Sequence, residues 1–238
     1  MTRVALISDA HGNAVGLRAA LADLADRRVD QIVCLGDVAQ GGPQPAECLE
    51  LLRGAGARTV LGNSDAFLLD PASTKDEANE RHLAQREWAL ARLSGADLAD
   101  LHSFEPTIDL RLDGLRLLCF HGTPDSYEGV VLPADPPDGF AGTGADLLAG
   151  GHVHVPQLRR VADALYVNPG SVGAGYDHLQ WPEDDFHLDP WASYAIVESR
   201  SVEFHRVPFD VGELVAAISA GDFPFAEHSL SLWRRRHA

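Results

Sequence analysis

The 238-residue sequence has few cysteines and no long hydrophobic run, and each shortage excludes a class of protein. The three cysteines, Cys34, Cys48 and Cys119, show no C-x-x-C spacing, so neither a disulfide framework nor a thiolate zinc site is expected. The apolar run at residues 4–7 is too short to be the core of a signal peptide. No stretch approaches the ~20 apolar residues of a membrane span. We therefore expect a cytoplasmic protein.

Basic side chains are also scarce, because 19 Lys and Arg stand against 35 Asp and Glu, for a formal net charge of −16. Stable binding to DNA, RNA or an anionic membrane normally requires a basic face, so we expect none of these partners. A small phosphate-containing substrate remains compatible with this charge, because a few cations in a pocket can invert its sign locally. The Walker loop, H-E-x-x-H and G-x-S-x-G motifs of other enzyme classes are absent.

Apolar runs alternate with helical patterns in the first half of the chain, which is typical of strand–helix–strand units around a parallel sheet. The second half is predicted to be mostly strands, with a hairpin at Asp113-Gly114. We expect one domain over residues 1–238, with a helical edge or cap segment at about 74–103 and a flexible tail at 230–238. The expected strands are 4–7, 31–35, 59–61, 107–112, 115–120, 145–148, 157–161, 165–167, 194–197 and 202–207; the expected helices are 13–28, 45–53, 74–93 and 211–219.

Residues that can bind metal ions follow five of the predicted strands, at the point where each strand ends. They are Asp9 and His11, Asp37, Asn63 and Asp65, His121, and finally His152 and His154. Ligands gather at the carboxyl ends of strands in open α/β sheets, so these loops can converge. Residues two apart in extended chain point to the same side, so Asp9 with His11 can direct two ligands at one region. Oxygen and imidazole donors without thiolate suit manganese, iron or zinc.

Each motif alone has an ordinary explanation as a capped loop or a turn, but together and in this order the motifs resemble the calcineurin-like metallophosphoesterase superfamily. The resemblance covers about residues 3–207. The stretch I-S-D-A-H-G-N at residues 7–13 and the turn N-P-G-S-V-G at residues 168–173 resemble its small bacterial predicted-phosphodiesterase branch. The resemblance implies an α/β (α+β) fold, a four-layer αββα sandwich in which helices flank two mixed β-sheets.

The resemblance also implies which residues bind metal. One ion would be bound by Asp9, His11, Asp37 and His154, and a second by Asp37, Asn63, His121 and His152. Asp37 would bridge the two ions. We expect manganese, with iron and zinc as alternatives. The candidate catalytic residues are Asp37, Asn63, Asp65 and His121, of which Asp65 is expected to orient a water or a ligand histidine.

The implied activity is hydrolysis of a small phosphodiester by a hydroxide that bridges two divalent ions. A monoester dianion usually needs additional arginines or lysines, and none lies beside a ligand motif, which favours the diester. A phosphomonoesterase or protein phosphatase and a dinucleoside polyphosphate hydrolase are the alternatives. A non-catalytic, protein-binding scaffold of the same fold is disfavoured, because all seven ligand positions hold residues that can bind metal. The physiological substrate and the oligomeric state are left open.

Two features depart from the family pattern. Many members carry a histidine directly after the asparagine, where it assists the leaving group, whereas this chain has Ser64. Because serine is a poor general acid at pH 7, we expect good activity on aryl esters and slower cleavage of alkyl esters. The segment at residues 175–191 is longer than the corresponding family connection. Its aromatic side chains could stack a base, but we favour a surface loop, with His178 and His187 at the surface.

Overall fold

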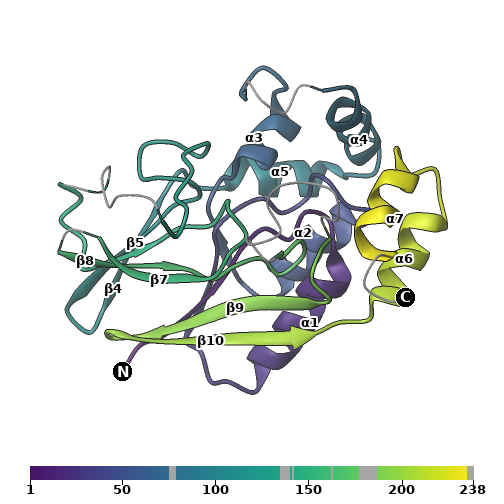
Figure 1. Ribbon diagram of the computed structural model, residues 1–238. Coiled ribbons are helices and arrows are strands. Elements are labelled where there is room, and N and C mark those ends of the chain that lie inside the picture. Colours follow the sequence, from purple (N-terminus) through teal and green to yellow (C-terminus); the bar gives the residue numbers. More distant parts are fainter. Residues whose placement is uncertain (75–78, 135–139, 141, 162, 177–186, 235–238) are drawn as a thin grey trace.

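The computed structural model describes residues 1–74, 79–134, 140, 142–161, 163–176 and 187–234 (Figure 1). Within these residues ten strands form two five-stranded mixed sheets, which confirms the predicted fold class. No described helix is long and apolar enough to cross a membrane. Single-domain organisation and cytoplasmic location stay predictions.

The first sheet has the strand order β10-β9-β1-β2-β3. Its strands are β1 (Arg3–Ile7), β2 (Gln31–Cys34), β3 (Arg58–Thr59), β9 (Trp191–Glu198) and β10 (Ser201–Pro208). The three strands β1, β2 and β3 run parallel, while β9 is antiparallel to both of its neighbours. The parallel strands therefore point their carboxyl ends at one edge of the sheet.

The second sheet has the order β4-β5-β6-β8-β7. Its strands are β4 (Ile108–Leu112), β5 (Leu115–Cys119), β6 (Leu147–Ala149), β7 (Gln157–Val161) and β8 (Ala164–Asn168). Here β5, β6 and β8 are the parallel strands, and the predicted hairpin joins β4 to β5. The second sheet thus has a parallel centre between antiparallel edge strands, whereas the first has its parallel strands on one side and its antiparallel pairs on the other.

Alternation along β1 shows how the sheet buries both faces. Val4 and Leu6 pack against the second sheet, in a core that includes Ile108 and Leu117. Ala5 and Ile7 face the opposite way, toward the helices that cover the outer face of the first sheet. Strands that are buried on both faces are expected to be apolar throughout, as residues 4–7 are.

The described helices are α1 (Ala14–Ala25), α2 (Pro45–Gly54), α3 (Asn63–Leu69), α4 (Glu80–Leu90), α5 (Gly95–Ser103), α6 (Val211–Ser219) and α7 (Ala226–Arg234). Helix α1 begins directly after the first ligand motif, because the Asn13 side chain caps it by accepting from the Gly16 N–H at 3.0 Å. The expected cap segment contains α4 and α5, of which α4 lies close to α7 in Figure 1.

Two parts of the chain differ from the expectation. Residues 230–234, expected in a flexible tail, belong to α7, where Leu230 and Trp233 are buried against α6; residues 235–238 lie outside the described residues. The outer face of the second sheet packs against Val131 and Phe140 of the β5–β6 connection. In its described residues this cover is a loop, where the resemblance implied helices.

Candidate metal centre

The carboxyl ends of β1, β2, β5 and β6 meet at one edge of the sandwich and are joined there by backbone hydrogen bonds. The Asp9 N–H donates to the Gly36 carbonyl at 3.0 Å, and the His11 N–H donates to the Asp37 carbonyl at 2.9 Å. Within the second sheet, the Gly151 N–H donates to the His121 carbonyl at 2.7 Å. Within each sheet, these bonds fix neighbouring ligand loops relative to one another.

The predicted metal ligands form two groups of three. In one group are Asp9, His11 and His154, and in the other Asp37, His121 and His152. Within each group the ligand atoms lie within 4.8 Å of one another. Asn63 joins the second group, because its Oδ1 lies 2.9 Å from His121 Nε2. All seven predicted ligands are therefore brought together as the spacing and the resemblance implied.

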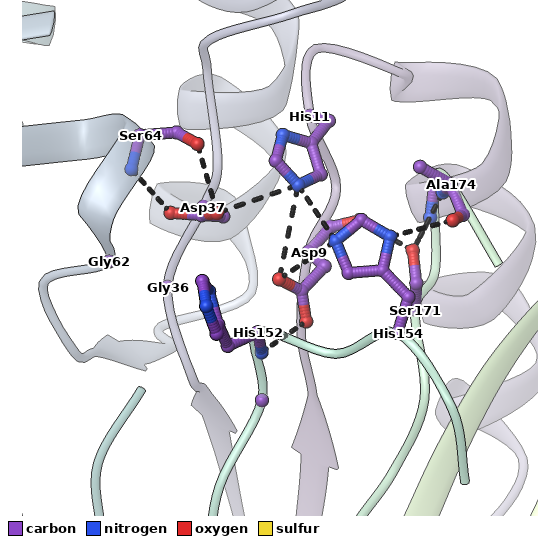
Figure 2. A network of polar contacts seen from close by, with 12 residues as sticks. Asp9, His11, Gly36, Asp37, Gly62, Ser64, His152, His154, Ser171 and Ala174 are labelled. Carbon is purple, nitrogen blue, oxygen red and sulfur yellow. Dashed lines mark hydrogen bonds and ion pairs between the residues drawn. The ribbon is translucent and has the colours of Figure 1, made fainter. Parts of the chain in front are cut away.

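A single oxygen of Asp37 connects the two groups, and Figure 2 shows its contact with His11. Asp37 Oδ2 lies 3.5 Å from His11 Nε2 and 3.4 Å from His121 Nε2. The two imidazoles belong to different groups, so one buried carboxylate oxygen faces ligands of both. This is the position that a bridging carboxylate requires.

Three of the four histidines are oriented by backbone carbonyls. The Nδ1 atoms of His11, His121 and His154 lie 3.0, 2.6 and 2.7 Å from carbonyl oxygens of Gln40, Leu35 and Ala174. A hydrogen bond of this kind places the proton on Nδ1 and leaves the Nε2 lone pair for a metal ion. The Nε2 atoms of His11 and His154 lie 3.0 Å apart, so one metal ion could accept both lone pairs.

The backbone at the ligands is strained. Nine described non-glycine residues have positive φ, and five of them are the ligands Asp9, His11, Asp37, His152 and His154. The left-handed region disfavours residues with a Cβ, although Asp and His tolerate it better than most. Residues held in this way concentrate at functional sites, where the surrounding structure fixes them.

Asp65 supports the shared ligand through the backbone. Its Oδ2 accepts the Asp37 N–H at 2.8 Å and its Oδ1 accepts the Val38 N–H at 2.9 Å. Oδ2 also accepts the N–H of Gly62, the residue that precedes α3. Asp65 therefore fixes the loop that carries Asp37. Its predicted role in orienting a water or a ligand histidine stays a prediction.

Ser64 contacts the same carboxylate directly. Its N–H donates to Asp37 Oδ1 at 2.8 Å and its hydroxyl donates to Oδ2 at 2.9 Å. Gly62 is required nearby, because a Cβ at that position would lie 2.1 Å from Asp37 Oδ1. Within the G-N-S-D motif, Gly62 and Ser64 therefore adjoin the carboxylate of Asp37, while Asp65 holds its backbone N–H.

The turn at residues 168–173 secures the remaining loops. Asn168 Nδ2 donates to the Gly151 carbonyl at 2.6 Å, and Ser171 Oγ donates to the Asp9 carbonyl at 2.7 Å. The first bond restrains the backbone just before the ligand His152, and the second restrains the backbone of the ligand Asp9. The turn thus acts as a support for both ligand loops.

Burial and neighbouring charges shift the pKa values in opposite directions within the site. Burial lowers the pKa of His121, but the carboxylate of Asp37 outweighs it and raises the pKa to about 10. Burial and the nearby His121 lower the pKa of His152 to about 4. Although burial raises the pKa of Asp37, His121 and His11 hold it well below its usual range. Burial raises the pKa of Asp65 to about 7, with a further contribution from Asp37.

The donor set fits divalent metal ions. The buried Oδ1 of Asp9 accepts no hydrogen bond from any described residue, yet it lies 3.4 Å from His154 Nε2. Such an oxygen is costly to bury unless a cation or donor satisfies it. Imidazole, carboxylate and amide donors together suit manganese, iron or zinc. Divalent metal binding is therefore the chemistry for which these residues are arranged.

A cavity of about 280 Å³ opens beside the first ligand group. His11, His154 and Ser64 line it, together with Arg81 and Gln85 from α4. Sequence reasoning missed both α4 residues, although their spacing of four places them on one side of a helix. The ring of Tyr176, at the start of the long segment, lies 5.9 Å from that of His154. Residues 177–186, including His178, lie outside the described residues.

Comparisons with known proteins agree with this geometry. The family model for the calcineurin-like phosphoesterase superfamily domain matches residues 2–181. The uncharacterized protein MJ0912 of Methanocaldococcus jannaschii is 29% identical over 240 residues, which cover 93% of each chain. The crystal structure of a metallophosphoesterase from Sphaerobacter thermophilus is 29% identical with a TM-score of 0.76, and covers 97% of this chain and 96% of its own.

A second solved structure, the hypothetical protein PH1004 of Pyrococcus horikoshii OT3, shares the fold over 98% of both chains with a TM-score of 0.82 and 18% identity. The fold similarity therefore extends beyond residue 181 and includes the antiparallel strands β9 and β10 and the C-terminal helices. With two ligand groups at the carboxyl ends of its parallel strands and a family match over most of its length, the chain belongs to the calcineurin-like phosphoesterase superfamily.

Proposed function

We propose that the protein is a phosphodiesterase that requires two divalent metal ions and hydrolyses a small phosphodiester. The observation that carries this proposal is the position of Asp37 Oδ2, at 3.5 Å and 3.4 Å from histidine nitrogens of the two ligand groups. A carboxylate oxygen shared in this way supports a pair of ions rather than one.

The roles of the chain's residues follow from this arrangement. Asp9, His11 and His154 would bind one ion, His121, His152 and Asn63 the other, and Asp37 both. When bound, such a pair lowers the pKa of a shared water and stabilises negative charge on phosphoryl oxygens. Manganese is our first choice, with iron and zinc as alternatives.

Ser64 limits the range of leaving groups. Its hydroxyl donates to Asp37, so the proton is held by a carboxylate rather than directed at the leaving group. Without a general acid at this position, we propose that esters with stabilised leaving groups react fastest.

The charge of the cavity supports a diester. Among the described residues that line it, Arg81 alone carries a permanent positive charge. One such charge matches the monoanion of a diester more closely than the dianion of a monoester. A phosphomonoesterase is the second candidate, because Arg81 brings to the cavity the cation that the ligand motifs lack. Stable binding of nucleic acid or membrane stays outside the proposal.

The test is a matrix of metals against substrates. Purified protein is loaded with Mn²⁺, Fe²⁺ or Zn²⁺, its metal content is measured, and turnover is compared on bis-nitrophenyl and mono-nitrophenyl phosphate. We expect two ions per chain and faster turnover of the diester. Asp37→Asn should lose both ions and lower turnover at least about 10³-fold, as loss of a residue essential to two-metal chemistry does. Asp26→Asn, an exposed change at the end of α1, is the matched control. Full turnover by Asp37→Asn would contradict the proposal.

A further inference from the structure

We propose that the cavity between α4 and the first ligand group binds a phosphodiester in which one esterifying group carries hydrogen-bond donors, as a nucleoside does. In this complex Arg81 pairs with the phosphoryl oxygens, and Gln40 and Gln85 accept hydrogen bonds from the organic group. The inference rests on the proposed function and specifies the substrate class.

The position of the cavity connects it to the chemistry. Its wall includes the ligands His11 and His154 on one side and the N-terminal turns of α4 on the other. Its volume of about 280 Å³ is just below the usual range for small-molecule sites, roughly 300–1,000 Å³. A group esterified to a phosphate at the metal centre would therefore extend directly toward α4.

Two buried amide oxygens call for a ligand with donors. Gln40 and Gln85 both line the cavity, with 3% and 1% of their surface exposed. Gln40 Nε2 donates to the His82 carbonyl at 3.1 Å, and Gln85 Nε2 donates to the Pro224 carbonyl at 3.4 Å. In each amide the Oε1 atom is buried and accepts no hydrogen bond from any described residue. Burying such an acceptor without a donor is unfavourable, and a hydroxyl or N–H of a ligand would satisfy it.

Arg81 supplies the charge that a phosphate needs. It lies one helical turn before Gln85 on α4, so both side chains lie on one side of the helix. Its Nη2 donates to His82 Nε2 at 2.8 Å, which fixes part of the guanidinium. A guanidinium has five N–H donors in a planar fork that matches phosphate oxygens, and Arg81 lies in the wall of the cavity.

Another part of the cavity wall is apolar or aromatic. Leu188 and Leu232 line the cavity together with Tyr176, whose ring lies 5.9 Å from that of His154. An aromatic ring and aliphatic side chains favour a group with a flat or apolar face over a fully hydrated one. The expected ester therefore combines a charged phosphate, at least one hydrogen-bond donor and an apolar surface.

Two substrates with the same leaving group test the proposal. Bis(p-nitrophenyl) phosphate has no hydrogen-bond donor, whereas the p-nitrophenyl ester of thymidine 5′-monophosphate has a hydroxyl and an imide N–H. We expect the wild type to prefer the thymidine ester in kcat/KM. Gln85→Met, similar in volume but unable to accept a strong hydrogen bond, should lower that preference about fivefold to tenfold. An unaltered preference would overturn the assignment.

Charge is tested separately. Arg81→Gln should raise KM for both esters about tenfold or more and weaken binding of inorganic phosphate to the metal-loaded protein, measured by calorimetry. Arg92→Gln removes the same charge just beyond α4, where Arg92 bonds to Asp222 and does not line the cavity, so it should leave both values as in the wild type. Equal phosphate affinity in Arg81→Gln and wild type would contradict the role of Arg81.

Binding of thymidine 5′-monophosphate separates this inference from the proposed function. If the wild type hydrolyses neither ester with any metal, the proposed function fails. Binding of the nucleotide that Gln85→Met weakens would still support the cavity assignment. Turnover of both esters without preference, together with nucleotide binding that neither α4 variant changes, would overturn the inference while leaving the phosphodiesterase proposal in place.

Discussion

The two metal-ligand groups meet at Asp37 but differ in where their histidines lie. In the first group the side chains of His11 and His154 are 20% and 17% exposed and line the cavity under α4. In the second group His121 is fully buried and its imidazole is held between Leu35 and Asp37. His152 of the same group is partly exposed but is not among the residues that line this cavity. The comparison shows that the histidines of the first group meet the cavity, while His121 of the second is part of the core and depends on the fold for its geometry.

The largest expected difference between the groups is in the stability of the metal-free protein. His121→Ala removes a buried partner of Asp37 and of the Leu35 carbonyl and leaves a cavity, so we expect a loss of about 3–5 kcal/mol in the free energy of unfolding. His11→Ala should lose about 1 kcal/mol, because water reaches that position. Urea denaturation in the presence of a chelator measures both. Equal losses of unfolding free energy in the two variants would mean that the burial of His121 does not distinguish it from His11.

Asp65→Asn tests whether both groups depend on the shared loop. The substitution weakens the hydrogen bonds that hold the N–H groups of Asp37 and Val38, while it keeps the side-chain volume. We expect metal affinity to fall about 10–100-fold, the usual effect of losing a residue that orients a ligand. Titration with Mn²⁺ should show weaker binding of both ions. Weaker metal binding at the group of His121 alone would argue that Asp37 does not act as a bridge.

The protons released on metal binding should also distinguish the two ligand groups. Because the pKa of His121 is raised to about 10, this imidazole carries a proton at pH 8 in the metal-free protein, whereas His152, with a pKa of about 4, does not. A metal ion must displace the His121 proton. The metal affinity of the group that contains His121 should therefore rise about tenfold per pH unit between pH 7 and 9. Calorimetry in two buffers with different ionisation enthalpies counts the released protons. A count of zero would contradict this prediction.

Much of the fold and most of the site could be predicted from the sequence, because both depend on local signals. Hydrophobic runs mark β1 and β2, and polar residues that follow such runs must lie at strand ends. The helix predicted at 211–219 and the strand predicted at 157–161 have those bounds in the structure. No helix was predicted directly after the third strand, yet Asn63 begins α3, whose first turn contacts Asp37 through Ser64.

The features that were missed depend on packing between distant segments. Arg81 and Gln85 lie in a charged helix whose sequence reveals a shared side but not the neighbour that this side contacts. The contact of Gln85 with Pro224 joins residues 139 positions apart, which no local pattern encodes. Leu230 and Trp233 have helical spacing, yet the basic residues that follow them suggested a solvated tail.

The left-handed backbone at the ligands has a consequence for engineering this protein. Glycine would relax the chain at Asp9, His11, Asp37, His152 or His154, since only glycine adopts positive φ without a steric penalty. Each such change would also remove a donor atom from the site. A glycine substitution that stabilises the backbone at one of these five positions would therefore also remove a metal ligand. Attempts to raise the melting temperature must leave these positions unchanged.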